Sequence, residues 1–139
     1  MTQIVDSPEQ MEAAGASLIQ SVSPPAIIFL RGNLGAGKTT FVRGALRGLG
    51  YQGHVKSPTF TIVESYTFSS LTIHHFDLYR ISDPEELDFI GMREYNTDST
   101  VCFIEWPDMG LGMIPKPTIE VNIEYLDSNR QLSITDHRS

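Results

Sequence analysis

A glycine-rich segment limits the possible folds of this chain more than any other feature of the sequence. Residues 32–39 read Gly-Asn-Leu-Gly-Ala-Gly-Lys-Thr, the pattern G-x-x-x-x-G-K-[ST]. Glycines allow backbone turns closed to other residues, so that successive N–H groups can point at one anion. Lys38 can then reach the outer phosphates of a nucleotide, and the Thr39 hydroxyl suits Mg²⁺. We call residues 32–39 the glycine-rich loop, and its pattern predicts a phosphate-binding P-loop.

The stretches on both sides of this loop have the pattern that a P-loop requires. Residues 26–30 form a short apolar run, typical of a buried parallel strand. Residues 40–49 carry apolar side chains at helical spacing, and Gly50 is suited to end that helix. Strand, loop and helix in this order place phosphate at a helix N-terminus. The residues expected to bind the nucleotide are Asn33, Leu34, Gly35, Ala36, Gly37, Lys38, Thr39 and Thr40.

Helix and hairpin signals appear before and after this unit. Ser7 and Pro8 predict a helix start, as N-cap and first helical residue, and Gln10 completes a capping box. Alternating apolar residues from 60 to 66 and the segment 71–77 predict a hairpin that turns at 69–70. Because a hairpin is antiparallel and the P-loop strand is of the parallel type, we expect a mixed sheet.

The second half of the chain continues the alternation of helices and strands. A capping residue, a proline and two acids predict a short helix that starts within residues 82–86. Residues 101–104 predict a buried strand, and residues 118–125 and 130–135 a further hairpin. We therefore expect one P-loop ATPase domain over residues 1–139. Its fold class is α/β, a P-loop NTPase-like three-layer domain with a central mixed β-sheet flanked by helices.

Two carboxylates follow predicted strands and are candidates for the metal site of a P-loop protein. Asp77 ends the segment 71–77, and Glu105 follows the apolar run 101–104. The carboxyl ends of parallel strands meet at one edge of the sheet, where ligands bind. Glu105 and Thr39 are the first choices as magnesium ligands, and Asp77 could bind the metal or orient the attacking water. We expect Lys38, Asp77 and Glu105 to be catalytic, although either acid could instead be a solvated strand end.

Several neighbours of these acids have alternative interpretations. His75 could bind a metal, but a structural, hydrogen-bonded histidine is the favoured interpretation. Arg80 could stabilise charge or pair at the surface. Trp106 suits local packing, a pocket wall or a partner contact. Thr59 and Thr61 lie where nucleotide switches place a γ-phosphate sensor, but β-branched residues are also ordinary in strands.

Composition excludes several classes of protein. The formal net charge is −7, without the basic stripe that a broad nucleic-acid surface requires. No apolar stretch approaches the length of a membrane span, and the N-terminus lacks a secretory signal. Cys102 is the single cysteine, so no internal disulfide can form, and we expect an inert, buried thiol and a cytoplasmic location.

The choice between ATP and GTP rests on a missing pattern. The chain has no N-K-x-D segment for reading guanine. Residues 88–91 match D-x-x-G, but no strand precedes them, so this match is interpreted as chance. ATP with Mg²⁺ is the expected ligand.

Five segments together resemble the TsaE (YjeE) family of bacterial ATPases. They are residues 32–40, Ser-Pro-Thr-Phe at 57–60, His-Phe-Asp-Leu-Tyr-Arg at 75–80, Pro-Glu-Glu-Leu at 84–87 and Glu-Trp-Pro at 105–107. The P-loop is shared with many families, whereas the combination is much more specific. The resemblance extends from Pro8 to about Arg130, and many family members continue further at the C-terminus.

The resemblance implies a role in the threonylcarbamoyladenosine modification of tRNA. It implies weak ATP hydrolysis that resets the TsaB–TsaD heterodimer, so that tRNA is met only through that complex. Lys38 and Thr39 would be the phosphate and Mg²⁺ ligands, Asp77 and Glu105 the acids of the metal site. The adenine site carries no comparable motif, and we expect residues 8–12 and Arg130 to border it. The switch or partner-contact candidates are Ser57, Pro58, Thr59, Tyr79, Arg80 and Trp106.

Two other functions remain open from the sequence. A P-loop also serves small-molecule kinases, although no arginine-rich lid for an acceptor substrate is visible. Alternatively, ATP could only order a binding surface for TsaB–TsaD, without required hydrolysis.

Overall fold

The two most apolar strands of the chain form the centre of the sheet. The computed structural model describes residues 1–138. Strands β2 (Ala26–Arg31) and β5 (Thr100–Glu105) run parallel, and all their residues except Arg31 are buried. Burial on both faces is characteristic of parallel strands covered on each side, which explains their continuous apolar sequence.

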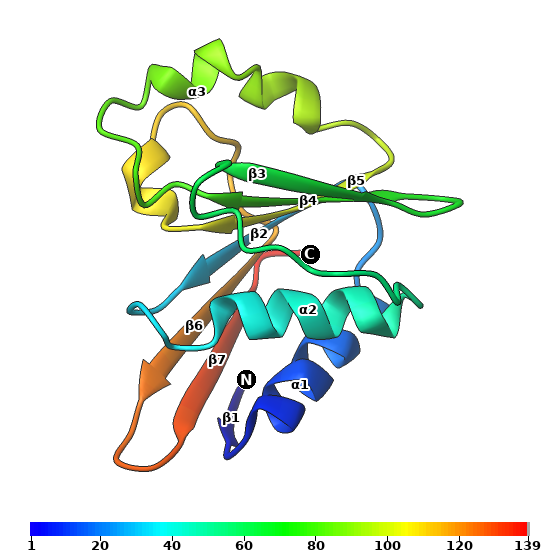
Figure 1. Cartoon of the computed structure of the whole chain (residues 1–139), viewed down its shortest axis with the longest axis vertical. Helices are drawn as coiled ribbons and strands as arrows, with labels where there is room; N and C mark the ends of the chain where they lie inside the picture. Colours follow the sequence, from blue (N-terminus) through cyan, green and yellow to red (C-terminus); the bar gives the residue numbers. More distant parts are fainter. Residues whose placement is uncertain (139) are drawn as a thin grey trace.

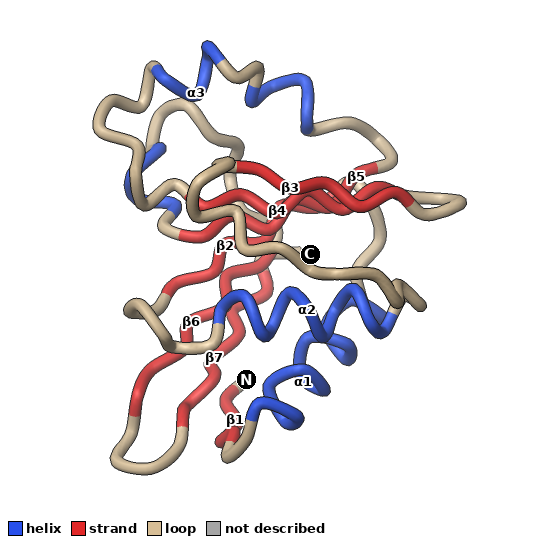
Figure 2. Tube along the Cα trace, in the orientation of Figure 1, coloured by secondary structure: helices blue, strands red, loops and turns tan. Residues whose placement is uncertain are grey.

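Parallel strands flank this centre and antiparallel strands form the edges. The order of the seven-stranded sheet is β1-β7-β6-β2-β5-β4-β3. On either side of the centre, β4 (Thr72–Asp77) runs parallel to β5, and β6 (Ile119–Tyr125) runs parallel to β2. The antiparallel strands are β3 (Val63–Thr67), β7 (Arg130–Asp136) and β1 (Thr2–Val5). Figure 2 follows this sheet through the molecule, and the parallel and antiparallel strand pairings confirm the expected mixed sheet.

Helices lie on both faces of the sheet, as the three-layer expectation requires. In Figure 1, α1 (Pro8–Gln20) and α2 (Lys38–Gly48) lie together on one face. The other face is covered by α3 (Glu86–Phe89), the 3-10 turns η1 (Met92–Tyr95) and η2 (Pro107–Gly110), and their loops. A separate apolar cluster fills each interface.

Two glycines allow α1 and α2 to pack closely. A Cβ atom placed on Gly15 would lie 2.0 Å from the carbonyl oxygen of Phe41. A Cβ atom on Gly44 would lie equally close, 2.0 Å, to the carbonyl oxygen of Glu12. Contacts this short leave no room for a side chain, so both glycines are needed for the close packing of α2 on α1. This packing positions the N-terminus of α2, where the glycine-rich loop ends.

The expected start of α1 and end of α2 are confirmed with small changes. The Ser7 hydroxyl accepts from the backbone N–H of Gln10 at 3.2 Å, as an N-cap should. The Gln10 side chain accepts from the N–H of Asp6, one residue before the cap. Leu49 is the C-cap of α2, and Gly50 follows it with φ of 92°.

The structure differs from the expected secondary structure at two strands. Strand β1 was not expected, because it is short, exposed at three of its residues, and formed only by pairing with β7. The strand expected from Phe60 begins at Val63, since Ile62 has φ of 72° and interrupts the extended backbone. The short helix expected to start within residues 82–86 is present, and it begins at the last of them, Glu86, and has four residues.

Two local expectations, a buried Cys102 and a chance match at residues 88–91, agree with the structure. Cys102 is fully buried, and burial raises the pKa of its thiol to about 12, as expected for an inert cysteine. Residues 88–91 lie in and after α3, with no strand before them. Within residues 1–138, none of the helices has the length and apolar character needed to cross a membrane.

Candidate active site at the glycine-rich loop

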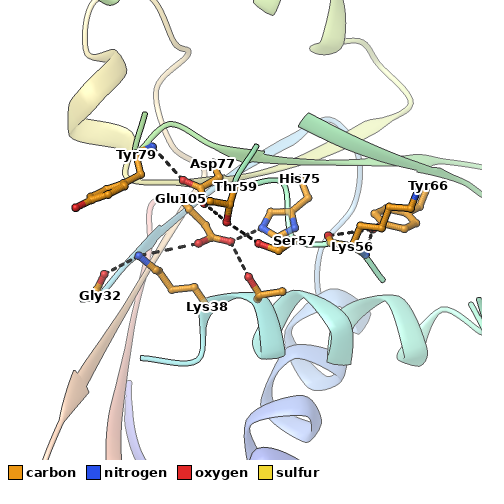
Figure 3. Close-up of polar contacts among 11 residues, drawn as sticks. Gly32, Lys38, Lys56, Ser57, Thr59, Tyr66, His75, Asp77, Tyr79 and Glu105 are labelled. Atoms are coloured by element: carbon orange, nitrogen blue, oxygen red, sulfur yellow. Dashed lines mark hydrogen bonds and ion pairs between the residues drawn. The ribbon is translucent and has the colours of Figure 1, made fainter. Parts of the chain in front are cut away.

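The sheet and α2 bring the predicted catalytic side chains into one cavity. Lys38 and Thr39 are the first residues of α2, and Asp77 and Glu105 are the last residues of β4 and β5. Because Asp77 pairs with Glu105 in the parallel register, both acids point from one sheet edge toward the start of α2. The cavity has a volume of about 290 Å³, and Figure 3 shows the polar contacts along it.

Lys38 is held inside the protein by other groups. Its ammonium donates to the carbonyl oxygen of Gly32 at 2.6 Å and lies 4.0 Å from Glu105 Oε1. It also lies 3.8 Å from the centre of the Trp106 ring, a cation–π contact. Burial lowers the pKa of Lys38, and the negative charges of Glu105 and Asp77 partly oppose this. The lysine is therefore engaged with protein groups before any ligand binds.

Glu105 is the centre of the hydrogen-bond network. Its Oε2 accepts from the Thr39 hydroxyl at 3.3 Å and lies 2.5 Å from Nε2 of the fully buried His75. Its Oε1 faces Lys38. This contact fits the favoured interpretation of His75 as a structural, hydrogen-bonded histidine.

Asp77 links the cavity to the segment expected to be a switch. Its Oδ1 accepts from the N–H of Tyr79 at 3.0 Å, and its Oδ2 accepts from the Thr59 hydroxyl at 3.4 Å. Thr59 in turn shares a 2.8 Å hydrogen bond with Ser57. Burial raises the pKa of Asp77, and nearby Glu105 raises it further, while the Tyr79 N–H and Lys38 lower it.

Trp106 has a strained backbone at the mouth of the cavity. Its φ of 56° and ψ of 52° lie in the left-handed region, which is costly for a bulky residue. Its ring lies against Lys38 and packs on the Tyr79 ring, with 4.9 Å between ring centres. Strain of this kind gathers at functional sites. Among the alternatives for Trp106, the structure therefore favours a pocket wall.

The β6–β7 hairpin holds the glycine-rich loop from outside. The Tyr125 hydroxyl donates to the carbonyl oxygen of Gly35, and Arg130 Nη2 donates to the same oxygen at 3.3 Å. Gly35 and Gly37 have φ of 78° and 111°, the left-handed conformations for which glycine is suited. Tyr125 was not anticipated from the sequence, because no local pattern connects it to a loop 90 residues earlier.

A second pocket lies on the other side of the loop. It shares Gly35, Gly37 and Thr40 with the first cavity and has a volume of about 120 Å³. Its other lining residues include Pro8, Met11 and Arg130. These include the region that the sequence suggested for adenine.

Some candidate residues lie away from the cavity. The Thr61 hydroxyl donates to Glu64, and Arg80 is exposed with its guanidinium 4.4 Å above the Phe60 ring. Of the two expected sensors, only Thr59 lines the cavity. Asn33 lines a separate pocket with Arg31 and Asn122, and Pro58 is buried.

The donors present fit a magnesium ion that arrives with a nucleotide. No group of three or more His, Cys, Asp and Glu side chains in residues 1–138 could hold a metal by itself. The Thr39 hydroxyl and the Glu105 carboxylate are hard oxygen donors that already lie together. Mg²⁺ in nucleotide sites commonly takes one or two such protein ligands and completes its shell with phosphate and water.

The sheet, the loop and the strand-end acids define a P-loop NTPase-like α/β protein. A family model described as "Threonylcarbamoyl adenosine biosynthesis protein TsaE" matches residues 5–132. The chain belongs to the TsaE family, as its sequence segments suggested.

Individual relatives agree with this assignment. A protein of Haemophilus influenzae named "tRNA threonylcarbamoyladenosine biosynthesis protein TsaE" is 54% identical over 109 residues, which cover 78% of this chain and 68% of that protein. The protein of the same name from Bacillus subtilis is 35% identical over 130 residues, 93% of this chain and 81% of that protein. The crystal structure of Bacillus subtilis YdiB superposes with a TM-score of 0.82 at 29% identity, covering 98% of this chain and 84% of that one.

Proposed function

We propose that this protein binds and hydrolyses Mg²⁺–ATP in the making of threonylcarbamoyladenosine in tRNA. The observation that carries the proposal is the convergence of Lys38, Thr39, Asp77 and Glu105 in one cavity beside the glycine-rich loop. Family membership supplies the biological setting. A role in tRNA modification would place the protein in the cytoplasm with its tRNA.

Each residue of the cavity has a role in this proposal. The glycine-rich loop presents backbone N–H groups to the phosphates, and Lys38 turns from Gly32 and Glu105 to the outer phosphates. Mg²⁺, when bound, neutralises charge that develops on the phosphates. Thr39 and Glu105 would hold that ion directly or through water. Asp77 is placed to bind a metal water or to orient the attacking water.

The pocket beyond Gly37 is suited to the base of the nucleotide. It is small and mainly apolar, and it adjoins the phosphate cavity at Gly35, Gly37 and Thr40. Met11 and the stem of Arg130 lie beside Gly37, where a flat ring could pack. Adenine is our proposal for this ring.

We further propose that the TsaB–TsaD heterodimer is the partner and that hydrolysis resets it between turnovers. The modified base would be the adenosine next to the anticodon of ANN-decoding tRNAs, reached only through that complex. The engagement of Lys38 by Glu105 and Trp106 supports a weak ATPase alone, because these contacts compete with the phosphates. A partner that touches the segment 57–59, Tyr79 or Trp106 could change that competition.

The direct test measures phosphate release by the protein alone and with TsaB–TsaD. We expect the partner to raise turnover, and Lys38→Ala to remove most ATP binding or turnover. If TsaB–TsaD stimulates a control homologue but leaves the turnover of this protein unchanged, the partnership is refuted. Full activity of Lys38→Ala would refute the assignment of residues 32–39 as the phosphate-binding loop. Transfer of labelled γ-phosphate to a metabolite would instead indicate a kinase.

A binding module without required hydrolysis is the second candidate. It is favoured by the same engagement of Lys38, since nucleotide binding alone must rearrange that contact. A Glu105→Ala protein that binds ATP without turnover separates the two. If it sustains normal tRNA modification in single-turnover assays with TsaB–TsaD, hydrolysis is dispensable.

A further inference from the structure

His75 is a fully buried polar residue that forms a hydrogen bond with Glu105. It lies on β4 two residues before Asp77, so its side chain is on the sheet face that α2 covers. Its Nε2 lies 2.5 Å from Glu105 Oε2. Its Nδ1 is buried and has no hydrogen-bond partner among residues 1–138.

Burying a histidine with one unpaired ring nitrogen destabilises a fold, so its presence here needs an explanation. Ile73 and Phe103 on the same face belong to the apolar core, so a leucine would suit this environment. Burying an imidazole with one nitrogen unpaired destabilises the fold, because that nitrogen loses its hydrogen bonds to water. Local packing therefore does not explain a histidine here, whereas the contact with Glu105 does.

The other two contacts of Glu105 are temporary in the proposed function. Thr39 and Lys38 approach its two oxygens at 3.3 Å and 4.0 Å. Both residues are expected to engage the metal and the phosphates when nucleotide binds. His75 is fully buried and does not line the cavity, so its contact with Glu105 can persist when nucleotide binds.

We propose that His75 is a positioning residue that holds the Glu105 carboxylate for the metal. The inference rests on the proposed function. The Nε2–H donates to Glu105 Oε2, and the bare Nδ1 faces the core, which avoids burying an unpaired N–H. With Oε2 fixed, the carboxylate keeps one orientation when Lys38 and Thr39 leave it. Hydrogen-bonding partners of metal-binding carboxylates commonly act in this way.

The test compares two substitutions at this position. His75→Gln keeps an N–H donor at a similar reach, and His75→Leu keeps the volume without a donor. The probe is Mn²⁺ binding in the presence of ADP, followed by electron paramagnetic resonance, with metal-free ADP affinity measured in parallel. We expect His75→Leu to weaken Mn²⁺ binding by about 10- to 100-fold while metal-free ADP affinity stays within about twofold, and His75→Gln to recover most of the loss.

His74→Leu is the matched control, since His74 is adjacent on β4 but contacts Ser65 and Tyr95 instead. It should bind Mn²⁺ like the wild type. Circular dichroism establishes that each variant is folded. If His75→Leu does not fold, His75→Asn replaces it, because the shorter amide falls short of Glu105.

The outcomes separate the inference from the proposed function. Wild-type Mn²⁺ affinity in the donor-free variant would overturn the inference alone, as would a His75→Gln protein as weak as His75→Leu. A wild-type chain that binds neither ADP nor Mn²⁺ would overturn the proposed function, and the inference with it. A selective loss of Mn²⁺ affinity that glutamine restores supports the positioning role.

Discussion

If Lys38 binds the phosphates as proposed, replacing Trp106 with leucine should strengthen nucleotide binding, because the tryptophan ring competes for the lysine. The Lys38 ammonium lies 3.8 Å from the centre of the Trp106 ring, and the lysine is only 5% exposed. A cation–π contact contributes from about 0.5 kcal/mol at exposed sites to about 2 kcal/mol when shielded from water. For this buried lysine we take about 1–2 kcal/mol, which corresponds to about 5- to 30-fold in affinity.

The assay is a titration with fluorescent ADP at constant ionic strength. Trp106→Leu should bind about 5- to 30-fold more tightly than the wild type, because Lys38 no longer has to leave the ring. Phe60→Leu is the matched control: it removes an exposed aromatic ring of the same region that contacts Arg80 and not Lys38. It should leave the affinity unchanged.

Unchanged or weaker ADP binding by Trp106→Leu would refute this reasoning. Unchanged binding would mean that Lys38 leaves the ring at no cost. Weaker binding would mean that the ring contacts the nucleotide more strongly than it contacts the lysine.

Three further predictions concern stability. Burial lowers the pKa of Lys38 below 10.5, so at pH 7 the charged lysine is less favourable in the folded state than in the unfolded chain. Lys38→Met should therefore raise the melting temperature while removing ADP binding. A lower melting temperature would contradict this. Burial raises the pKa of Asp77 above 3.8, so its contribution to stability is complete below pH 3.8 and is lost as pH rises through the folded-state pKa. Asp77→Asn should therefore stabilise the protein at pH 7, with a gain in urea-unfolding free energy that shrinks as pH falls; a pH-independent gain would exclude this cause. Gly15→Ala would place a Cβ atom 2.0 Å from the carbonyl oxygen of Phe41 and should lower the free energy of urea unfolding by about 1–3 kcal/mol or more. The control Ser17→Ala, at an exposed position of the same helix, should change that free energy by less than about 0.5 kcal/mol. Equal effects of the two substitutions would show that the contact between α1 and α2 relaxes without cost.

Local chemistry explains why much of the fold was predictable. The apolar runs 26–30 and 101–104 can only be buried, and the glycine-rich loop needs a strand before it and a helix after it. The placement of Asp77 and Glu105 at one edge followed from the rule that parallel strands share their carboxyl ends. The hairpin of β6 and β7 was readable because both strands alternate across a short polar turn.

Errors occurred where tertiary contacts outweigh local pattern. Phe60 continues an apolar alternation in the sequence, but it is 81% exposed, because the backbone turns at Ile62 before β3 begins. Strand β1 has little apolar pattern and forms because β7 offers an unpaired edge. Arg80 could not be placed from sequence, and the structure puts it on the Phe60 ring outside the cavity.

The α/β class, the glycine-rich loop, the two strand-end acids and the family could all be predicted from short sequence segments, because the chemistry of each segment is local. The contacts among these groups, in contrast, depend on the packing of the folded chain. The engagement of Lys38 by Gly32, Glu105 and Trp106, and of Glu105 by His75, joins residues up to 68 positions apart from different elements. Local patterns carry no information about such distances, because a side chain's partners depend on how strands and helices pack.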